Sequence, residues 1–312
     1  MLAIETEGLE KYYQTGFFRN QRKLALKPLT LTVEESEVFG CLGPNGAGKT
    51  TTIKLLLGLV FPSGGTVRIL QRPLDDIAIK RDIGFLPEQP YFYDHLTAKE
   101  LLEYYARLSG VSGGERRKKV DRALARVGMS EHARTQLRKF SKGMLQRVGI
   151  AQAIVHDPKL VILDEPMSGL DPVGRREVRD LIQELNEEGK TIFFSTHILS
   201  DAETLCDRVA VLDRGKLKGV GVVADLLREM SGDVEVTWRG AQPIATLSAL
   251  GARCHATGEV VRARMPERSL DAALEALRNH QGRLISVTPV RATLEDYFLA
   301  RIATEKDVEV QA

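Results

Sequence analysis

GPNGAGKT, residues 43–50, is the stretch of this 312-residue chain that decides its fold. It fits the pattern G-x-x-x-x-G-K-[ST], and it stands between an apolar run typical of a strand, residues 38–42, and a run with helical spacing. Gly43, Gly46 and Gly48 leave room for backbone N–H groups to close around phosphates. In this setting the pattern predicts a phosphate-binding loop (P-loop) of an α/β fold. The alternative is a glycine-rich turn that only joins the strand to the helix.

The last two residues of the stretch carry its chemistry. We expect Lys49 to reach the β- and γ-phosphates of a nucleotide, and the hydroxyl of Thr50 to ligate Mg²⁺. No acidic residue follows in the first turn of the predicted helix. The positive end of that helix is therefore available to an external anion.

A second apolar run, KLVILDEP at residues 159–166, ends in two acidic residues. Its uninterrupted length is typical of a central parallel strand that is buried on both faces. Ligands of open α/β sheets bind at the C-terminal ends of such strands. We therefore predict that Asp164 holds Mg²⁺ and that Glu165 polarises the attacking water. Taken alone, the run would be interpreted as a buried strand that ends in a solvated turn.

A third buried-strand pattern, KTIFFSTH at residues 190–197, ends in a histidine. An isolated histidine at the end of a strand is usually structural. After a P-loop and an acidic strand end, His197 becomes a candidate to contact the γ-phosphate.

Two serines compete to begin the helix that reads the nucleotide of a second protomer. Ser112 and Glu115 form S-x-x-E, which predicts a capping box that satisfies the helix's own N–H groups. Ser141 is followed by no acidic residue, so its helix start can still bind an anion. Asp164 follows Ser141 by 23 residues, which is room for one helix and a turn, and follows Ser112 by 52. We therefore choose Ser141 and interpret Ser112 as the capped start of a solvated, cationic helix.

Together these motifs resemble the ATP-binding cassette (ABC) ATPases of ABC transporters. The resemblance covers about residues 2–225, in the family's motif order: GPNGAGKTT, FSKGMLQR, LVILDEP, SGLD and STH. FSKGM stands where the family has LSGGQ, and it keeps the serine and the second glycine. SGLD matches the D-loop, and Tyr13 matches the aromatic residue that stacks on adenine. The Q-loop glutamine of the family aligns with Glu88, and the glutamine itself is the next residue, Gln89, so which of them serves stays open.

The resemblance implies a set of site residues. Catalysis is expected from Glu165, His197 and Lys49. Mg²⁺ is expected at Thr50, Glu88, Gln89 and Asp164. The residues expected to bind ATP are Tyr13, Gly43, Pro44, Asn45, Gly46, Ala47, Gly48, Lys49, Thr50, Thr51, Ser141, Gly143 and Asp171.

The resemblance and the patterns after it also predict the domains. Residues 1–225 are expected to form an α/β nucleotide-binding domain, a P-loop ABC ATPase with a RecA-like core and a helical subdomain at about residues 90–155. Helical spacing in residues 97–110 and 115–128 suits that subdomain. Residues 226–312 are expected to form a small α+β domain with a βαβαβ alternation and a closing helix near residues 293–303. That part shows no recognisable catalytic motif, so regulation or dimer support is its expected role.

Function and partners follow from the resemblance and the composition. We expect the ATP-hydrolysing subunit of an exporter, which energises separate integral membrane permease subunits and pairs with a second copy of itself around ATP. A net charge of +2 gives no reason to expect nucleic acid as a partner. The three cysteines are scattered, and the sequence shows no secretory signal. Its longest apolar run is far shorter than the roughly 20 residues that span a membrane. We therefore expect a cytoplasmic protein, peripheral on the inner face of the membrane. The alternative is a non-transport ABC ATPase of DNA repair or translation, although the sequence has neither coiled-coil insertions nor two cassettes.

One segment has two open interpretations. QTGFFRNQRK, residues 14–23, carries Phe17 and Phe18 followed by Arg19, Arg22 and Lys23. Paired aromatic residues beside cations suit the interface of a bilayer, so the segment could lie against the membrane or the rim of the transporter. It could equally be a solvated hairpin whose phenylalanines pack on the cassette.

Overall fold

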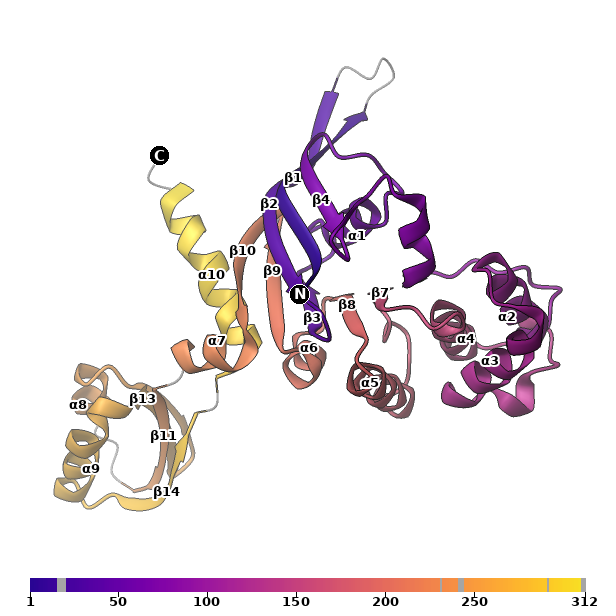
Figure 1. Cartoon of the computed structure of the whole chain (residues 1–312). Coiled ribbons are helices and arrows are strands. Elements are labelled where there is room, and N and C mark those ends of the chain that lie inside the picture. The colour runs from indigo at the N-terminus through magenta and orange to yellow at the C-terminus, as the bar shows by residue number, and fades with distance from the viewer. Residues whose placement is uncertain (16–20, 231, 241–243, 291, 310–312) are drawn as a thin grey trace. The chain divides into compact units, whose positions relative to one another are not determined.

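The chain divides into two compact units, each with its own hydrophobic core (Figure 1). The first covers Met1–Val223 together with the end of the chain from Arg301, and the second covers Ala224–Ala300. The structure, a computed structural model, describes residues 1–15, 21–230, 232–240, 244–290 and 292–309.

A six-stranded sheet forms the centre of the first unit, in the order β10-β9-β3-β8-β7-β6. β9, β3, β8, β7 and β6 are parallel, and β10 pairs with β9 in antiparallel orientation. Every residue of β3, β7 and β8 is buried, as the three apolar runs predict. The strands are β3 (Val38–Leu42), β6 (Ile83–Leu86), β7 (Leu160–Asp164), β8 (Thr191–Thr196), β9 (Arg208–Asp213) and β10 (Lys216–Val222).

The strands of this sheet contribute alternate side chains to two separate cores. Phe193 of β8 belongs to one core, and its neighbours Ile192 and Phe194 belong to the other. Successive side chains of a strand point to opposite faces, so both faces of the sheet are covered. Polar groups of this sheet can therefore meet a ligand only at the ends of its strands.

Helices cover the sheet and form a cluster beside it. α2, α3 and α4 lie together (Figure 1), α4 packs against β6, and α2 and α3 fall on the predicted helical runs. The helices of the unit are α1 (Lys49–Leu56), α2 (Ala98–Leu108), α3 (Gly113–Arg126), α4 (Lys142–Ile154), α5 (Pro172–Glu187) and α6 (Leu199–Leu205). Short 3₁₀ helices are η1 (Ile77–Asp82), η2 (Ser130–His132) and η3 (Leu137–Lys139).

The predicted capping box of α3 is wrong. Ser112 is the N-cap of α3, but its side chain makes no capping hydrogen bond. Glu115 instead lies 3.9 Å from Lys118 in an exposed ion pair, where water competes for the helix N–H groups. The capping box lies at α2, where the Thr97 hydroxyl accepts from the Glu100 N–H at 3.2 Å and the Glu100 carboxylate accepts from the Thr97 N–H at 2.8 Å.

A four-stranded antiparallel sheet, in the order β2-β1-β4-β5, packs on the core of the first unit. Its longest pair, β1 and β2, is a hairpin whose register runs to Thr15 opposite Gln21. Phe17, Phe18 and Arg19 of the proposed membrane segment lie outside the described residues, so the two interpretations of their contacts stay open. The strands are β1 (Leu2–Thr15), β2 (Gln21–Glu34), β4 (Gly64–Ile69) and β5 (Arg72–Pro73).

The second unit is a β-α-β-β-α-β module with the antiparallel order β12-β13-β11-β14. α8 and α9 lie on one face of its sheet (Figure 1). The predicted βαβαβ alternation is wrong by one strand, because β12 carries mostly exposed side chains and shows no apolar alternation. The elements after β10 are α7 (Val223–Met230), β11 (Asp233–Arg239), α8 (Ile244–Ala249), β12 (Arg253–Thr257), β13 (Val260–Pro266), η4 (Glu267–Ser269), α9 (Leu270–Asn279), β14 (Arg283–Pro289) and α10 (Leu294–Glu309). The part of α10 from Arg301 onward is assigned to the first unit.

Among the described residues, the structure has no helix that is both long enough and apolar enough to span a bilayer.

Candidate functional site

The loop between β3 and α1 has the backbone shape that its glycines predict. A Cβ added at Gly43 would lie 2.3 Å from the carbonyl oxygen of Leu212, so only glycine fits there. Gly48 is the N-cap of α1 with φ of 108°, a conformation that other residues rarely adopt. No acidic residue lies in the first turn of α1, as predicted. The first turn of α1 therefore supplies no carboxylate of its own to compete with an external anion.

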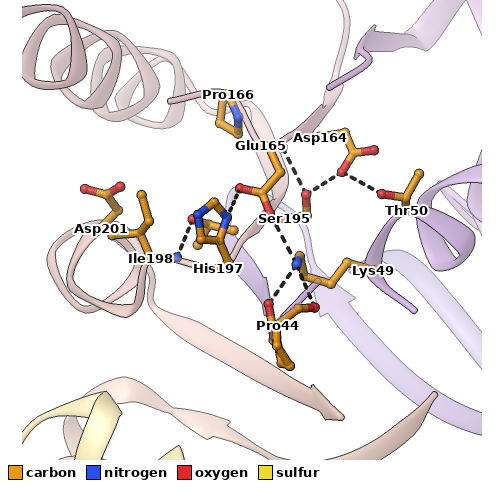
Figure 2. Close-up of polar contacts among 12 residues, drawn as sticks. Pro44, Lys49, Thr50, Asp164, Glu165, Pro166, Ser195, His197, Ile198 and Asp201 are labelled. Carbon is orange, nitrogen blue, oxygen red and sulfur yellow. Dashed lines mark hydrogen bonds and ion pairs between the residues drawn. The ribbon is translucent and has the colours of Figure 1, made fainter. Parts of the chain in front are cut away.

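Lys49 is buried and held by three oxygen atoms (Figure 2). Its ammonium donates to the carbonyl oxygens of Gly43 at 2.7 Å and Pro44 at 3.3 Å. The same ammonium lies 3.2 Å from a carboxylate oxygen of Glu165, which is also buried. The lysine of the P-loop and the acid that follows β7 are thus in direct contact.

Asp164 lies at the end of β7 and accepts two hydrogen bonds through its Oδ1 atom (Figure 2). The Ser195 hydroxyl donates at 2.6 Å, and the Thr50 hydroxyl donates at 3.4 Å. Burial raises the pKa of Asp164, against the two hydrogen bonds, which lower it. The Thr50 hydroxyl and the Asp164 carboxylate therefore form a compact pair of oxygen groups, the arrangement from which a magnesium site is built.

Glu165 is fixed from several directions. Its N–H donates to the Ser195 hydroxyl at 3.0 Å, and its backbone is in the left-handed region with φ of 51°. The other carboxylate oxygen, Oε2, lies 2.8 Å from Nδ1 of His197. Gln146 of α4 donates to the carbonyl oxygen of Pro166 at 3.0 Å and so anchors the turn after Glu165. A strained conformation with this many contacts is typical of a functional residue.

A second group of predicted residues lines a separate pocket of about 530 Å³. Ser141 is the N-cap of α4, and its hydroxyl accepts from the Met144 N–H at 3.3 Å. Gly143 and Asp171 line the same pocket, and the Asp171 carboxylate caps α5 by accepting from the Gly174 N–H at 2.9 Å. Within the described part of the chain, no hydrogen bond joins Ser141, Gly143 or Asp171 to the group around Lys49.

The remaining predicted residues lie apart from both groups. Tyr13 is on β1, half-buried, with the Lys11 ammonium 5.3 Å from its ring centroid. Glu88 and Gln89 are both exposed in the loop after β6, and the structure does not distinguish between them. The rest belong to the loop or to the first turn of α1: Pro44, Asn45, Gly46, Ala47 and Thr51.

Two residues of the site were not among those predicted. Ser195 is fully buried and bonds both Asp164 and Glu165, and Gln146 is buried beside them. A sequence signal exists only for Ser195, a small polar residue directly after the apolar residues 192–194 and two positions before His197. Gln146 gives no such signal, since nothing in the sequence says that α4 passes the end of β7.

Comparisons with known proteins agree on the family. The family model described as "ABC transporter" matches residues 26–168. An uncharacterised ABC transporter ATP-binding protein of Synechocystis is 45% identical over 96% of this chain and 84% of its own length. The linearmycin resistance ATP-binding protein of Bacillus subtilis is 31% identical over 95% of this chain and 97% of its own length. The bacitracin transport ATP-binding protein of Bacillus licheniformis is 42% identical over 69% of this chain and 68% of its own length.

Solved structures give the same result. A dimeric ATP-binding cassette in a post-hydrolysis state, bound to ADP and Pi, matches with a TM-score of 0.66 and 29% identity, over 70% of this chain and 98% of that one. An ATP-binding subunit of an ABC transporter matches with a TM-score of 0.64 and 33% identity, over 73% of this chain and 93% of that one. The P-loop, the acidic end of β7 and these relatives lead to one conclusion: the chain belongs to the ATP-binding proteins of ABC transporters and is an ATPase.

Proposed function

We propose that this chain is the ATP-hydrolysing subunit of an ABC exporter, working as an ATP-sandwich dimer on separate membrane permease subunits at the cytoplasmic face of the membrane. The observation that carries the proposal is the connected group Lys49, Thr50, Asp164, Glu165 and His197, which gathers a phosphate-binding cation, a metal-binding pair and a base at one edge of the sheet.

The contacts of this group suggest how hydrolysis proceeds. Phosphate oxygens of ATP that reach Lys49 compete with Glu165 for its ammonium. Glu165, still held at its N–H by Ser195, is then free to orient water and accept its proton. His197 holds the other oxygen of the Glu165 carboxylate and so fixes the direction in which it points. Positioning and charge supply most of the catalysis in such phosphoryl transfers.

The oxygen donors of the site fit Mg²⁺. This ion takes one or two protein carboxylates or hydroxyls and completes its shell with water and phosphate oxygens, which matches the Thr50 and Asp164 pair. Among the described residues, no cluster of three or more His, Cys, Asp or Glu side chains offers a metal site complete in itself. We assign Thr50 and Asp164 to the ion, with Glu88 or Gln89 as the contribution of the loop after β6. When bound, Mg²⁺ neutralises charge on the β- and γ-phosphates.

The pocket around Ser141 supports the dimer. Ser141, Gly143 and Asp171 gather on a surface that makes no hydrogen bond to the chain's own P-loop group in the described residues, which suits a role toward the nucleotide of a second copy. One similar cassette was solved as a dimer bound to ADP and Pi. The second unit, for which we propose an accessory role in regulation or dimer support, holds none of these residues.

The relatives favour export over DNA repair or translation. One relative is named for linearmycin resistance and another for bacitracin transport. Removing a toxic compound from the cell would account for the first name, and we extend that interpretation to this chain. Co-purification of a membrane permease with the tagged chain would support transport, and co-purification of ribosomes or DNA ends would contradict it.

The test of hydrolysis is Glu165→Gln. The amide keeps the shape of the side chain but accepts a proton poorly, so we expect ATP binding to persist and turnover to fall by about 10²–10⁴-fold. ATP hydrolysis by the purified chain and binding of a fluorescent ATP analogue measure the two effects. Near-normal turnover in this variant would remove Glu165 from the mechanism.

The test of the dimer places a second change in the Glu165→Gln chain. The single variant should form ATP-dependent dimers, measured by light scattering after gel filtration. Ser141→Arg, placed at the α4 N-cap, should abolish those dimers and leave ATP binding to the monomer intact, because its own P-loop is untouched. Ser112→Ala in the same background is the matched control and should dimerise normally. Dimers that survive Ser141→Arg would contradict our choice of helix.

A further inference from the structure

The sheet of the second unit has one face covered by helices and one face rich in arginine. Val234, Val236 and Trp238 of β11 are buried against α8 and α9, so the alternate residues of β11 project from the opposite face. The same alternation holds for β13, and the register of β12 and β14 continues it across the sheet. We call this the basic sheet face, and its cationic residues are Arg239, Arg253, Arg262, Arg264 and Arg283, with His255 among them in the register.

The arginines of this face stand directly opposite one another. Arg264 of β13 pairs in register with Arg253 of β12, and Arg239 of β11 pairs with Arg283 of β14. Like charges directly opposite on neighbouring strands destabilise a sheet. Two such pairs in one small sheet are therefore unfavourable for folding, and an anion that neutralises them would remove this cost.

Few acidic groups oppose this charge. Arg264 donates to Asp233 at 2.8 Å, and Glu235 is the other acidic residue on the face. Arg239, Arg253, Arg262 and Arg283 are exposed to solvent. Guanidinium groups are planar forks that match phosphate oxygens, so the face is suited to several phosphates at once.

We propose that the basic sheet face binds the anionic phospholipid headgroups of the membrane at which the transporter works. The inference rests on the proposed function only in placing the chain at the inner face of a membrane. It adds a lipid contact, made by the second unit, to the contacts that the cassette makes with its permease.

Charge decides against the other occupants. The short cytoplasmic loops of membrane proteins carry an excess of Lys and Arg, so a permease would present like charge to this face. A second copy that met it face to face would oppose arginines with arginines. Single-stranded nucleic acid is bound on sheets mainly through stacking aromatic side chains, and the described strands place no Phe, Tyr or Trp on this face, since Trp238 is buried on the other.

The experiment is flotation of the full chain with lipid vesicles. Wild-type chain should float with vesicles of phosphatidylcholine and phosphatidylglycerol at low salt and should not float with phosphatidylcholine alone. The face variant is Arg239→Gln, Arg253→Gln, Arg262→Gln and Arg283→Gln, with Arg264 kept because it bonds Asp233. One cation near an anionic surface contributes about fivefold in binding, so the four changes should weaken binding to the vesicles by roughly 600-fold.

The control variant removes the same charge from the first unit, at four exposed cations: Arg107, Arg117, Lys118 and Lys159, each changed to Gln. It should float like wild type, and Arg22 and Lys23 of the hairpin stay intact in both variants. The melting temperature of the face variant should not fall, because opposed charges are removed. If it does fall, the pairs Arg239→Gln with Arg283→Gln and Arg253→Gln with Arg262→Gln test each half.

Three results would overturn the inference: equal flotation with neutral and anionic vesicles, a face variant that floats like wild type, or displacement of the chain to duplex nucleic acid offered beside anionic vesicles. The ATPase rate is measured in parallel. A chain that hydrolyses ATP but ignores anionic vesicles contradicts the lipid contact alone, and a chain without ATPase activity contradicts the proposed function.

Discussion

Ser195 connects the two acidic residues of the nucleotide site. Its hydroxyl donates to Asp164 at 2.6 Å and accepts from the N–H of Glu165 at 3.0 Å, in a fully buried position. Ser195→Ala removes both contacts and leaves a buried N–H with one partner fewer, so we expect a loss of about 1–3 kcal/mol in the free energy of unfolding. Chemical denaturation measures it, with the exposed Ser200→Ala as control.

The same variant should affect chemistry more than binding. The N–H of Glu165 keeps only the Ser195 carbonyl oxygen as its acceptor, at 3.2 Å, and Asp164 loses its 2.6 Å hydrogen bond. Lys49 and the P-loop keep their contacts, so kcat should fall while KM for ATP changes little. A raised KM at constant kcat would show that Ser195 serves nucleotide binding instead.

Individual motif residues could be predicted because each lies in a short stretch with its own chemical pattern. Lys49 and Thr50 begin α1, and Asp164, Glu165 and His197 lie at or just after the ends of β7 and β8. The structure brings these five residues together. The role of Ser195 could not be predicted in this way. Its position opposite Asp164 depends on the register between β7 and β8, which the sequence of a single strand does not determine.

At the scale of single elements, two helix starts of similar sequence behave differently. Thr97 of α2 makes the full capping box, and Ser112 of α3 makes no capping bond with its side chain. Thr97→Ala should therefore lower the free energy of unfolding by about 1 kcal/mol. Ser112→Ala should change it by less than about 0.5 kcal/mol. Urea denaturation of the two variants side by side measures the contrast, and equal losses would contradict it.

The pattern S-x-x-E predicted the wrong helix start because it describes which bonds are possible and not which form. The carboxylate of Glu115 forms an ion pair with Lys118, one turn away, and the exposed N–H groups at the start of α3 can donate to water instead. Strands show the same limit: β3, β7 and β8 were predictable as buried runs, but β12 was not, since most of its side chains face solvent and leave no alternation to detect.

At the scale of the whole molecule, two cysteines report on the two units separately. Burial raises the pKa of the Cys41 thiol in β3 to about 12, and Cys254 in β12 is less buried. A higher pKa means less thiolate at a given pH, so iodoacetamide at pH near 8 should modify Cys254 first and Cys41 only when the first unit unfolds. Mass spectrometry across a urea series measures both sites. Modification of Cys41 in native buffer at the rate of Cys254 would contradict this prediction.

The order of strands in the sheets was beyond the sequence. Buried runs indicate that strands are central and parallel, but β3 lies between β8 and β9 rather than beside its sequence neighbours. The fold of the cassette was predicted from the family resemblance. The fold of the second unit was predicted from sequence patterns alone, and that prediction lacked the strand β12.

That position of β3 has a consequence for how the chain is made. β3 ends at Leu42, and the partners on its two sides, β8 and β9, begin at Thr191 and end at Asp213. Ribosomes add about 5–20 residues per second, so β3 waits roughly 10–30 s for both neighbours. Throughout that interval the apolar run VFGCL has two unpaired edges and can pair with other chains, so it is a natural client for chaperones. The hairpin β1–β2 can form early, but the group around Lys49 is complete only after His197, which follows β8, has been synthesised.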